Sequence, residues 1–115
     1  MTMSALDDLI QKYTADLKEK CGIDADAALL RKIAQGLGPS IYRDDAATVA
    51  SSNQEELDRV KNSFLVKKLG LTAGADLDKG LDAALDAYGR SNRNKYRVSL
   101  YYLLVKQFKK DSVYA

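Results

Sequence analysis

Hydrophobic residues occupy almost every side of residues 92–110, NRNKYRVSLYYLLVKQFKK, if this segment is wound as a helix. A helix that is apolar around its whole circumference must be covered on every side. The alternation of apolar residues from Tyr96 to Tyr102 would also fit a strand, but the run is long and has no second strand to pair with. The pattern therefore predicts a buried central helix. Four of its side chains should be nearly inaccessible to solvent: Leu100, Leu103, Leu104 and Phe108.

Four earlier segments show the spacing of helices with one apolar face, at residues 4–21, 24–37, 52–69 and 76–88. In each, apolar residues recur at i, i+3, i+4 and i+7, which places them on one side of a helix. Ser4 with Asp7 and Ser52 with Glu55 have the spacing of a helix-capping pair, and a glycine follows each segment. The order of segments predicts an all-α fold, a small bundle of about five helices around the C-terminal central helix.

The periodicity is weak between the second and third segments, at residues 39–52. We expect a loop there, with a short helical turn near residues 45–50. Ile41, Tyr42 and Val49 are the apolar residues that should fill the core from this loop.

Length and composition indicate a single domain, residues 1–115, because 46% hydrophobic and 30% charged residues are ordinary globular values. The lone Cys21 rules out an internal disulfide and is typical of a reducing compartment. Asp7 and Asp8 interrupt the start of the chain, so no signal peptide is expected. The longest apolar run, residues 100–105, is far shorter than the roughly 20 residues of a membrane span. These features predict a soluble, cytoplasmic protein with no membrane partner.

The chain contains no histidine, which removes the commonest acid–base catalyst and the commonest metal ligand. Cys21 has no histidine partner, and its place beside a helix C-terminus would raise its pKa, so we interpret it as structural. Four aspartates on the fourth helix could hold a hard cation, but the calcium-loop pattern is missing and a solvated or ion-paired face is the simpler interpretation. They are Asp76, Asp78, Asp82 and Asp86. No catalytic, cofactor-binding or metal-binding residue is predicted, and no cofactor.

One run has part of a DNA-binding pattern. IAQGLGPS, residues 33–40, has the small residue and the turn glycine of a helix-turn-helix. The second helix of that motif would need an apolar residue where Asp44 stands, and Asp44 and Asp45 would meet phosphate with the wrong sign. We interpret the run as an ordinary helix end.

Charge is unevenly distributed along the chain, although the net charge is only +2. Residues 87–110 include no acidic residue, and four cations gather at the predicted start of the last helix: Arg90, Arg93, Lys95 and Arg97. Cations are unfavourable at a helix N-terminus, so something negative should compensate them. We favour Asp82 and Asp86 on the preceding helix as internal partners. The alternative is an external anion such as phosphate, which makes the four cations the candidate site for an anion or a partner.

A family resemblance is carried by three segments: LGPSIYRDDAATVASS at 37–52, ELDRVKNSFLVKKLGL at 56–71 and NRNKYRVSLYYLLVKQF at 92–108. Taken in this order, they resemble the bacterial family catalogued as domain of unknown function 2853. The resemblance covers nearly the whole chain and implies a small α-helical bacterial protein. It implies no activity, because the family is uncharacterised and has no catalytic or binding residues to carry over.

Three functional hypotheses remain. The first is a non-catalytic helical interaction module that binds an unknown protein partner or associates with itself. The second is an accessory protein that binds nucleic acid or phosphate weakly through the four cations, with Tyr96 as a stacking partner. An enzyme ranks last because no histidine or activated nucleophile is present. Gel filtration tests self-association, and a salt-dependent shift with nucleic acid tests the second hypothesis.

Overall fold

Helices make up most of the chain. The computed structural model describes residues 5–42, 48–50, 53–72, 74–89 and 94–114. The α-helices are α1 (Ala5–Cys21), α2 (Ala27–Leu37), α4 (Gln54–Arg59), α5 (Ala75–Tyr88) and α6 (Arg97–Gln107). A π-helix, η2 (Val60–Lys68), continues α4, and two 3-10 segments, η1 (Gly38–Tyr42) and η3 (Asp111–Tyr114), follow α2 and α6. The fold is all-α, as predicted, with one short antiparallel ladder between β1 (Thr48–Ala50) and β2 (Asn94–Tyr96).

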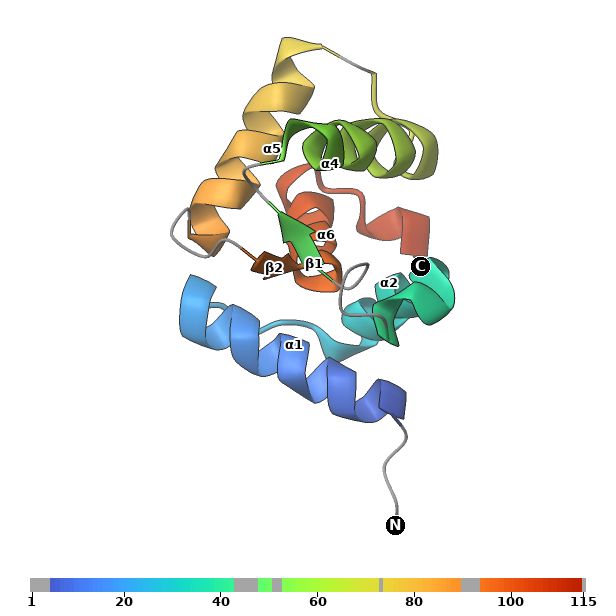
Figure 1. The fold of residues 1–115 in the computed structure, drawn as a ribbon, viewed down its shortest axis with the longest axis vertical. Coiled ribbons are helices and arrows are strands. Elements are labelled where there is room, and N and C mark those ends of the chain that lie inside the picture. Colours follow the sequence, from blue (N-terminus) through green and yellow to red (C-terminus); the bar gives the residue numbers. More distant parts are fainter. Residues whose placement is uncertain (1–4, 43–47, 51–52, 73, 90–93, 115) are drawn as a thin grey trace.

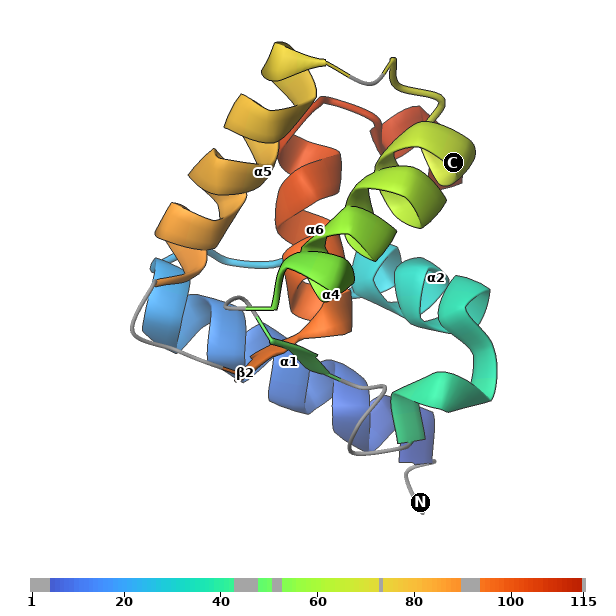
Figure 2. The same cartoon turned by 45° about the horizontal axis from the view of Figure 1, so that its top comes forward.

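The last helix, α6, lies at the centre of the molecule, and the prediction of a buried central helix is confirmed. Figures 1 and 2 show it enclosed by α1, α2, α5 and the α4–η2 segment. Leu100 and Leu104 are completely buried. Leu103 and Phe108 are only half-buried, which corrects the prediction for these two residues. Leu103 faces a hollow between α5 and α6, and Phe108 lies just beyond the end of the helix.

The start of α6 differs from the prediction. The helix begins at Arg97 rather than at residue 92, because Asn94–Tyr96 is a strand. This strand pairs with Thr48–Ala50, in the stretch for which a helical turn was expected. The alternating pattern before α6 therefore has a strand partner after all. The partner lies more than forty residues earlier in the chain, so local periodicity could not reveal it.

Two predicted helix starts are also shifted by one or two residues. The Asp26 side chain caps α2 by accepting hydrogen bonds from the backbone N–H groups of Ala28 and Leu29, at 3.0 and 3.4 Å. Asn53 caps α4 by accepting from the N–H of Glu56 at 3.3 Å. Ser4 and Ser52 lie outside the described residues. The glycines that follow the first four predicted helices all have positive φ, as expected at helix ends: Gly22, Gly38, Gly70 and Gly89.

The loop that should fill the core does so with two of its three apolar residues. Ile41 and Val49 are buried, with exposed fractions of 4% and 0%, whereas Tyr42 is 53% exposed and the prediction for it is wrong. Of the predicted helical turn, residues 45–47 lie outside the described residues. Asp44 and Asp45, which argued against a helix-turn-helix, lie there too.

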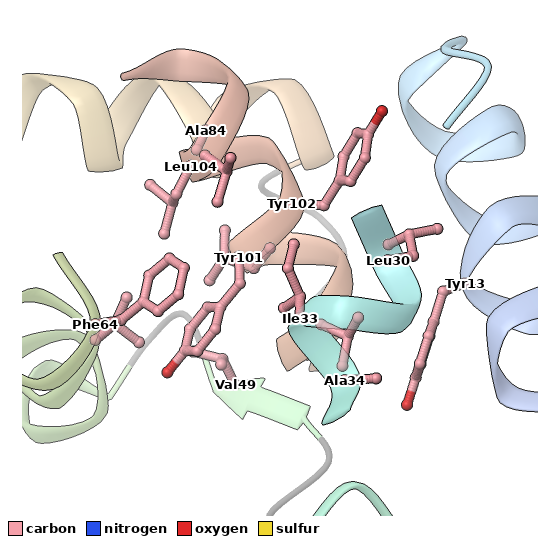
Figure 3. Packing of buried hydrophobic residues seen from close by; sticks show 14 of the residues in the cluster. Tyr13, Leu30, Ile33, Ala34, Val49, Phe64, Ala84, Tyr101, Tyr102 and Leu104 are labelled. Atoms are coloured by element: carbon pink, nitrogen blue, oxygen red, sulfur yellow. The ribbon is translucent and has the colours of Figure 1, made fainter. Parts of the chain in front are cut away.

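The buried apolar residues of the described segments form one cluster around α6 (Figure 3). Figure 3 shows the ring of Phe64, from η2, beside that of Tyr101, from α6. The two rings are stacked, with centroids 3.8 Å apart. None of the helices in the described part of the chain is long and apolar enough to cross a membrane.

Candidate functional site

The structure describes two of the four cations of the predicted site, Lys95 and Arg97. Arg97 is the first residue of α6, but Lys95 is in strand β2, where its backbone pairs with Val49. Arg90 and Arg93 lie outside the described residues. Lys95 thus precedes the helix instead of belonging to it, and a site formed by the four cations stays a prediction.

Arg97 forms an internal ion pair. Its Nη2 atom contacts Oε1 of Glu56, on α4, and its Nη1 atom donates a hydrogen bond to the Tyr101 hydroxyl at 3.2 Å. The side chains of Arg97 and Glu56 are only 16% and 14% exposed. Burial opposes the charge of Arg97, but the bonds to Tyr101 and Glu56 prevail and raise its pKa. This arginine stabilises the fold through the pairing of α6 with α4.

The sequence did not identify Glu56 as the countercharge. Glu56 precedes Arg97 by 41 residues and stands in the first turn of its helix, where a carboxylate is explained by the helix dipole. Asp82 and Asp86, the expected partners, lie exposed on α5, neither is without an interaction, and their pairing with the cations stays a prediction. Tyr96, the proposed stacking residue, packs against Tyr13 with ring centroids 5.4 Å apart and has the Lys12 ammonium 4.9 Å from its centroid.

A second candidate site is a groove along α2. One part, the Phe64 hollow, has a volume of about 200 Å³ and lies between α2, η2, α6 and η3. Its lining residues are Ile33, Gly36, Leu37, Ser63, Phe64, Lys68, Tyr101 and Tyr114. The floor is apolar and aromatic, because Ile33, Phe64 and Tyr101 are all nearly inaccessible to solvent.

The other part of the groove, the Lys32 hollow, has a volume of about 160 Å³. It is lined by Asp26, Ala28, Leu29, Lys32, Asp111 and Tyr114. Tyr114 lines both hollows, so its ring stands between them. The α2 residues of the two hollows are separated by three or four positions and thus form one side of the helix. We call the two hollows together the α2 groove.

The segment η3 occupies the middle of the α2 groove. It packs against α2, and Tyr114 joins the edge of the hydrophobic core. The Lys68 ammonium lies 5.1 Å from the centroid of the Tyr114 ring, a cation–π distance. Burial raises the pKa of Tyr114 to about 12. The groove therefore holds a short segment of the protein's own chain by an aromatic side chain.

A lysine and a carboxylate fix the start of η3. Nζ of Lys106, on α6, lies 2.6 Å from Oδ2 of Asp111. The hydrogen bond between them lowers the pKa of Asp111 and raises that of Lys106. Two points thus hold η3, one ionic at Asp111 and one aromatic at Tyr114.

Little in the sequence pattern indicates the α2 groove. Its wall includes η2, where Leu69 N donates to Phe64 O, a bond that spans five residues instead of four. A π-helix is rare and often occurs at functional sites, but the hydrophobic spacing here resembled that of an ordinary helix. Tyr114 follows the last predicted helix, and no local pattern marks it as a core residue.

The remaining candidates are Cys21 and the acidic side chains of the described residues. Cys21 is half-buried, and burial, followed by the nearby Asp16 carboxylate, raises its pKa against the effect of Lys20, so its thiolate is disfavoured. Among the described residues, no group of three histidine, cysteine, aspartate or glutamate side chains could hold a metal ion. The α2 groove offers aromatic faces and ammonium groups, which suit recognition of a ring and a carboxylate.

A comparison with known protein families gives a match. The sequence pattern of the family described as "Protein of unknown function (DUF2853)" matches residues 12–112. A search of curated proteins gives no match. The matched range includes α2, η2 and α6, which form most of the α2 groove, and extends over nearly all of the chain. The chain therefore belongs to the DUF2853 family of proteins of unknown function.

Proposed function

We propose that this protein is a non-catalytic interaction module that binds a short segment of another protein in the α2 groove. The observation that carries the proposal is the groove's present occupant. A segment of only four residues, η3, already lies there, with Tyr114 between the two hollows. A groove that accepts an aromatic residue of its own chain has the shape and polarity to accept one from a partner.

The second hypothesis from the sequence, weak binding of nucleic acid or phosphate, receives less support. Arg97 is largely buried and committed to Glu56 and Tyr101. Tyr96 is packed against Tyr13. We therefore place the interface at the α2 groove, in a protein that the lone, half-buried Cys21 suggests is cytoplasmic.

The test blocks the groove without touching the core. Gly36 lines the Phe64 hollow from the exposed surface of α2, and a Cβ atom there would meet Tyr114 only at an ordinary contact distance of 3.9 Å. Gly36→Arg would place a long side chain in the groove. Gln35→Arg is the matched control, because Gln35 is the exposed neighbour and does not line either hollow.

The measurement is a pull-down from native lysate with the wild-type chain and both variants. We expect a specific protein to be captured by the wild type and by Gln35→Arg, and to be lost with Gly36→Arg. Equal capture by all three would place the interface elsewhere. Capture of RNA that disappears at high salt would instead favour the second hypothesis.

A further inference from the structure

The segment η3 combines two recognition elements at a fixed spacing. Asp111 contacts Lys106, and Tyr114, three residues later, lies beside Lys68. In a 3-10 helix, residues i and i+3 lie on the same side, so the carboxylate and the ring both face the body of the protein. Ser112 and Val113, between them, are exposed. The specific contacts of η3 are thus an acidic residue and an aromatic residue three positions apart.

The rim of the α2 groove complements a negatively charged segment. Lys68 and Lys32 line the two hollows, and Lys106 stands at the end where Asp111 binds. Asp26, which directly precedes α2, also lines the groove, and its carboxylate caps the helix by accepting hydrogen bonds from Ala28 N and Leu29 N. Three ammonium groups around an apolar floor favour an occupant with both an acidic group and an aromatic ring.

The connection to α6 would allow η3 to leave the groove without unfolding α6. The helix ends with a complete Schellman motif, in which Lys110 N donates to Val105 O at 2.9 Å and Lys109 N donates to Lys106 O at 3.3 Å. These bonds provide hydrogen-bond donors for backbone carbonyl groups in the last turn of α6, before η3 begins. The Lys106–Asp111 pair is exposed, and Tyr114 is half-buried. Release of η3 would therefore break one exposed ion pair and uncover one ring.

We infer that η3 is a built-in competitor for the partner, and that the partner segment carries a carboxylate three residues before an aromatic ring. This inference rests on the proposed function and adds the chemistry of the partner and its regulation. A partner must displace η3, which is tethered beside the groove at a high effective concentration. The protein binds weakly while η3 is in place and tightly once it is displaced.

The experiment uses the full chain and a labelled synthetic peptide, acetyl-KDSVYA, which copies residues 110–115. Binding is measured by fluorescence anisotropy with the wild type, Tyr114→Ala and Tyr114→Phe. Tyr114→Ala removes the competing ring, so we expect its affinity for the peptide to exceed that of the wild type by about tenfold. Tyr114→Phe keeps the ring and should behave as the wild type does.

Two altered peptides test the recognition pattern. Replacement of the peptide tyrosine by alanine should abolish binding to Tyr114→Ala. Replacement of its aspartate by asparagine should weaken binding several-fold at low salt, and the difference should shrink as salt screens the lysines. A peptide with the aspartate and serine exchanged has the same composition at the wrong spacing and should bind as poorly as the asparagine peptide.

A second variant is a control for the possibility that Tyr114→Ala loses structure generally. Asp111→Asn changes an exposed residue and breaks the ion pair to Lys106, so it loosens η3 while the core stays intact. We expect its affinity for the peptide to lie between those of the wild type and Tyr114→Ala. Circular dichroism verifies that all variants remain helical.

The outcomes separate the inference from the proposed function. If the peptide binds all variants equally, or binds without regard to its aspartate, the inference fails while the groove remains a binding site. If no variant binds and Gly36→Arg changes nothing in the pull-down, the proposed function fails as well. If the wild type is a dimer that Tyr114→Ala dissociates, a second copy's η3 fills the groove, and a separate partner is contradicted.

Discussion

Arg97 has a different role in the structure from the one that its sequence neighbours indicated. The sequence placed it in an exposed cationic cluster, whereas the structure makes it a largely buried bridge from α6 to Glu56 on α4. Arg59 contacts the same Glu56 at 3.3 Å, but its side chain is 71% exposed. The two arginines thus share a partner and differ in burial, which makes them a matched pair.

We expect Arg97→Gln to lower the free energy of unfolding by about 1–3 kcal/mol, because a buried charged hydrogen bond is lost and Glu56 is left without this partner. Arg59→Gln should change it by less than about 0.5 kcal/mol, since exposed ion pairs contribute little. Urea denaturation of both variants measures the difference. Equal changes in the free energy of unfolding would mean that Arg97 behaves as an exposed cation, and would favour the anion-binding hypothesis.

Lys109 is the non-glycine residue with positive φ in the described part of the chain, at 54°. It stands at the position of the Schellman motif that glycine usually occupies. A left-handed conformation costs roughly 1–2 kcal/mol for a residue with a Cβ atom, and a glycine substitution removes this cost. Part of the resulting stabilisation is lost, because glycine has a larger conformational entropy in the unfolded chain. Lys109→Gly should therefore stabilise the protein by about 0.5 kcal/mol.

The control for Lys109→Gly is Lys110→Gly, which removes the same charge from the next residue, where φ is not positive. That variant should be destabilised by roughly 0.5–1 kcal/mol, because it gains flexibility without relief of strain. Thermal unfolding of both proteins provides the comparison. Destabilisation of both would mean that the lysine charges, rather than the backbone conformation, dominate at the end of α6.

At the scale of elements, the close approach of α5 to the end of α6 depends on Gly80. This glycine is buried inside α5, unlike the four glycines that follow the predicted helices. A Cβ atom at this position would overlap the ring of Phe108. The missing side chain thus lets the ring lie directly against the backbone of α5.

A double-mutant cycle tests this contact. Gly80→Ala in the wild type should lower the free energy of unfolding by about 1 kcal/mol, because the displaced Phe108 ring loses more burial than the helix gains in propensity. In a Phe108→Ala background the ring is absent, and the same change should stabilise by roughly 0.5–1 kcal/mol. The sign of the effect should therefore reverse. The same sign in both backgrounds would rule out the ring as the reason for the glycine.

Over the whole molecule, tyrosines connect the helices from inside. The Tyr88 hydroxyl, on α5, donates to Asp16 on α1 and accepts from Tyr96 N in β2 at 3.1 Å. The Tyr102 hydroxyl, on α6, accepts from Asp26 N at the start of α2 at 2.9 Å. The Tyr88–Asp16 and Tyr102–Asp26 bonds join helices that are far apart in the sequence, and the bond that Tyr88 donates requires a protonated hydroxyl.

Alkaline pH should therefore destabilise the fold. Burial raises the pKa of Tyr13 to about 12, and burial followed by the bond to Asp16 raises that of Tyr88 further. Between about pH 10, where tyrosine ionises in the unfolded chain, and about pH 12, the unfolded state binds fewer protons than the folded state. The stability from these groups is fully present below about pH 10 and decreases as the pH rises through the folded pKa.

Urea unfolding at about pH 9 and about pH 11 gives the measurement. We expect a loss of about 1 kcal/mol from Tyr13 alone, because its ionisation is suppressed in the folded state by more than one pH unit. Tyr13→Phe keeps the ring but cannot ionise, so its stability should depend less steeply on pH. A tyrosinate absorbance that rises to its full value with a midpoint near pH 10, without unfolding, would show that the buried tyrosines titrate normally.

The helical character of the chain and the identity of its central helix follow from the amino-acid pattern alone. Apolar residues on all sides of α6 can be satisfied only by burial, and Leu100 and Leu104 are buried as this reasoning requires. The glycine helix ends were equally predictable, because a positive φ is a local property of the backbone. Those features depend on short-range periodicity and sterics.

Contacts between residues that are distant in the sequence depend instead on how the elements pack in three dimensions. Three contacts join segments that are separated by more than forty residues: the β1–β2 ladder, the Arg97–Glu56 pair and the packing of Tyr114 against α2. The π-helix that forms a wall of the α2 groove also has no periodic signature of its own. Such contacts follow from how the helices pack, and a groove assembled from them is invisible to any local pattern in the sequence.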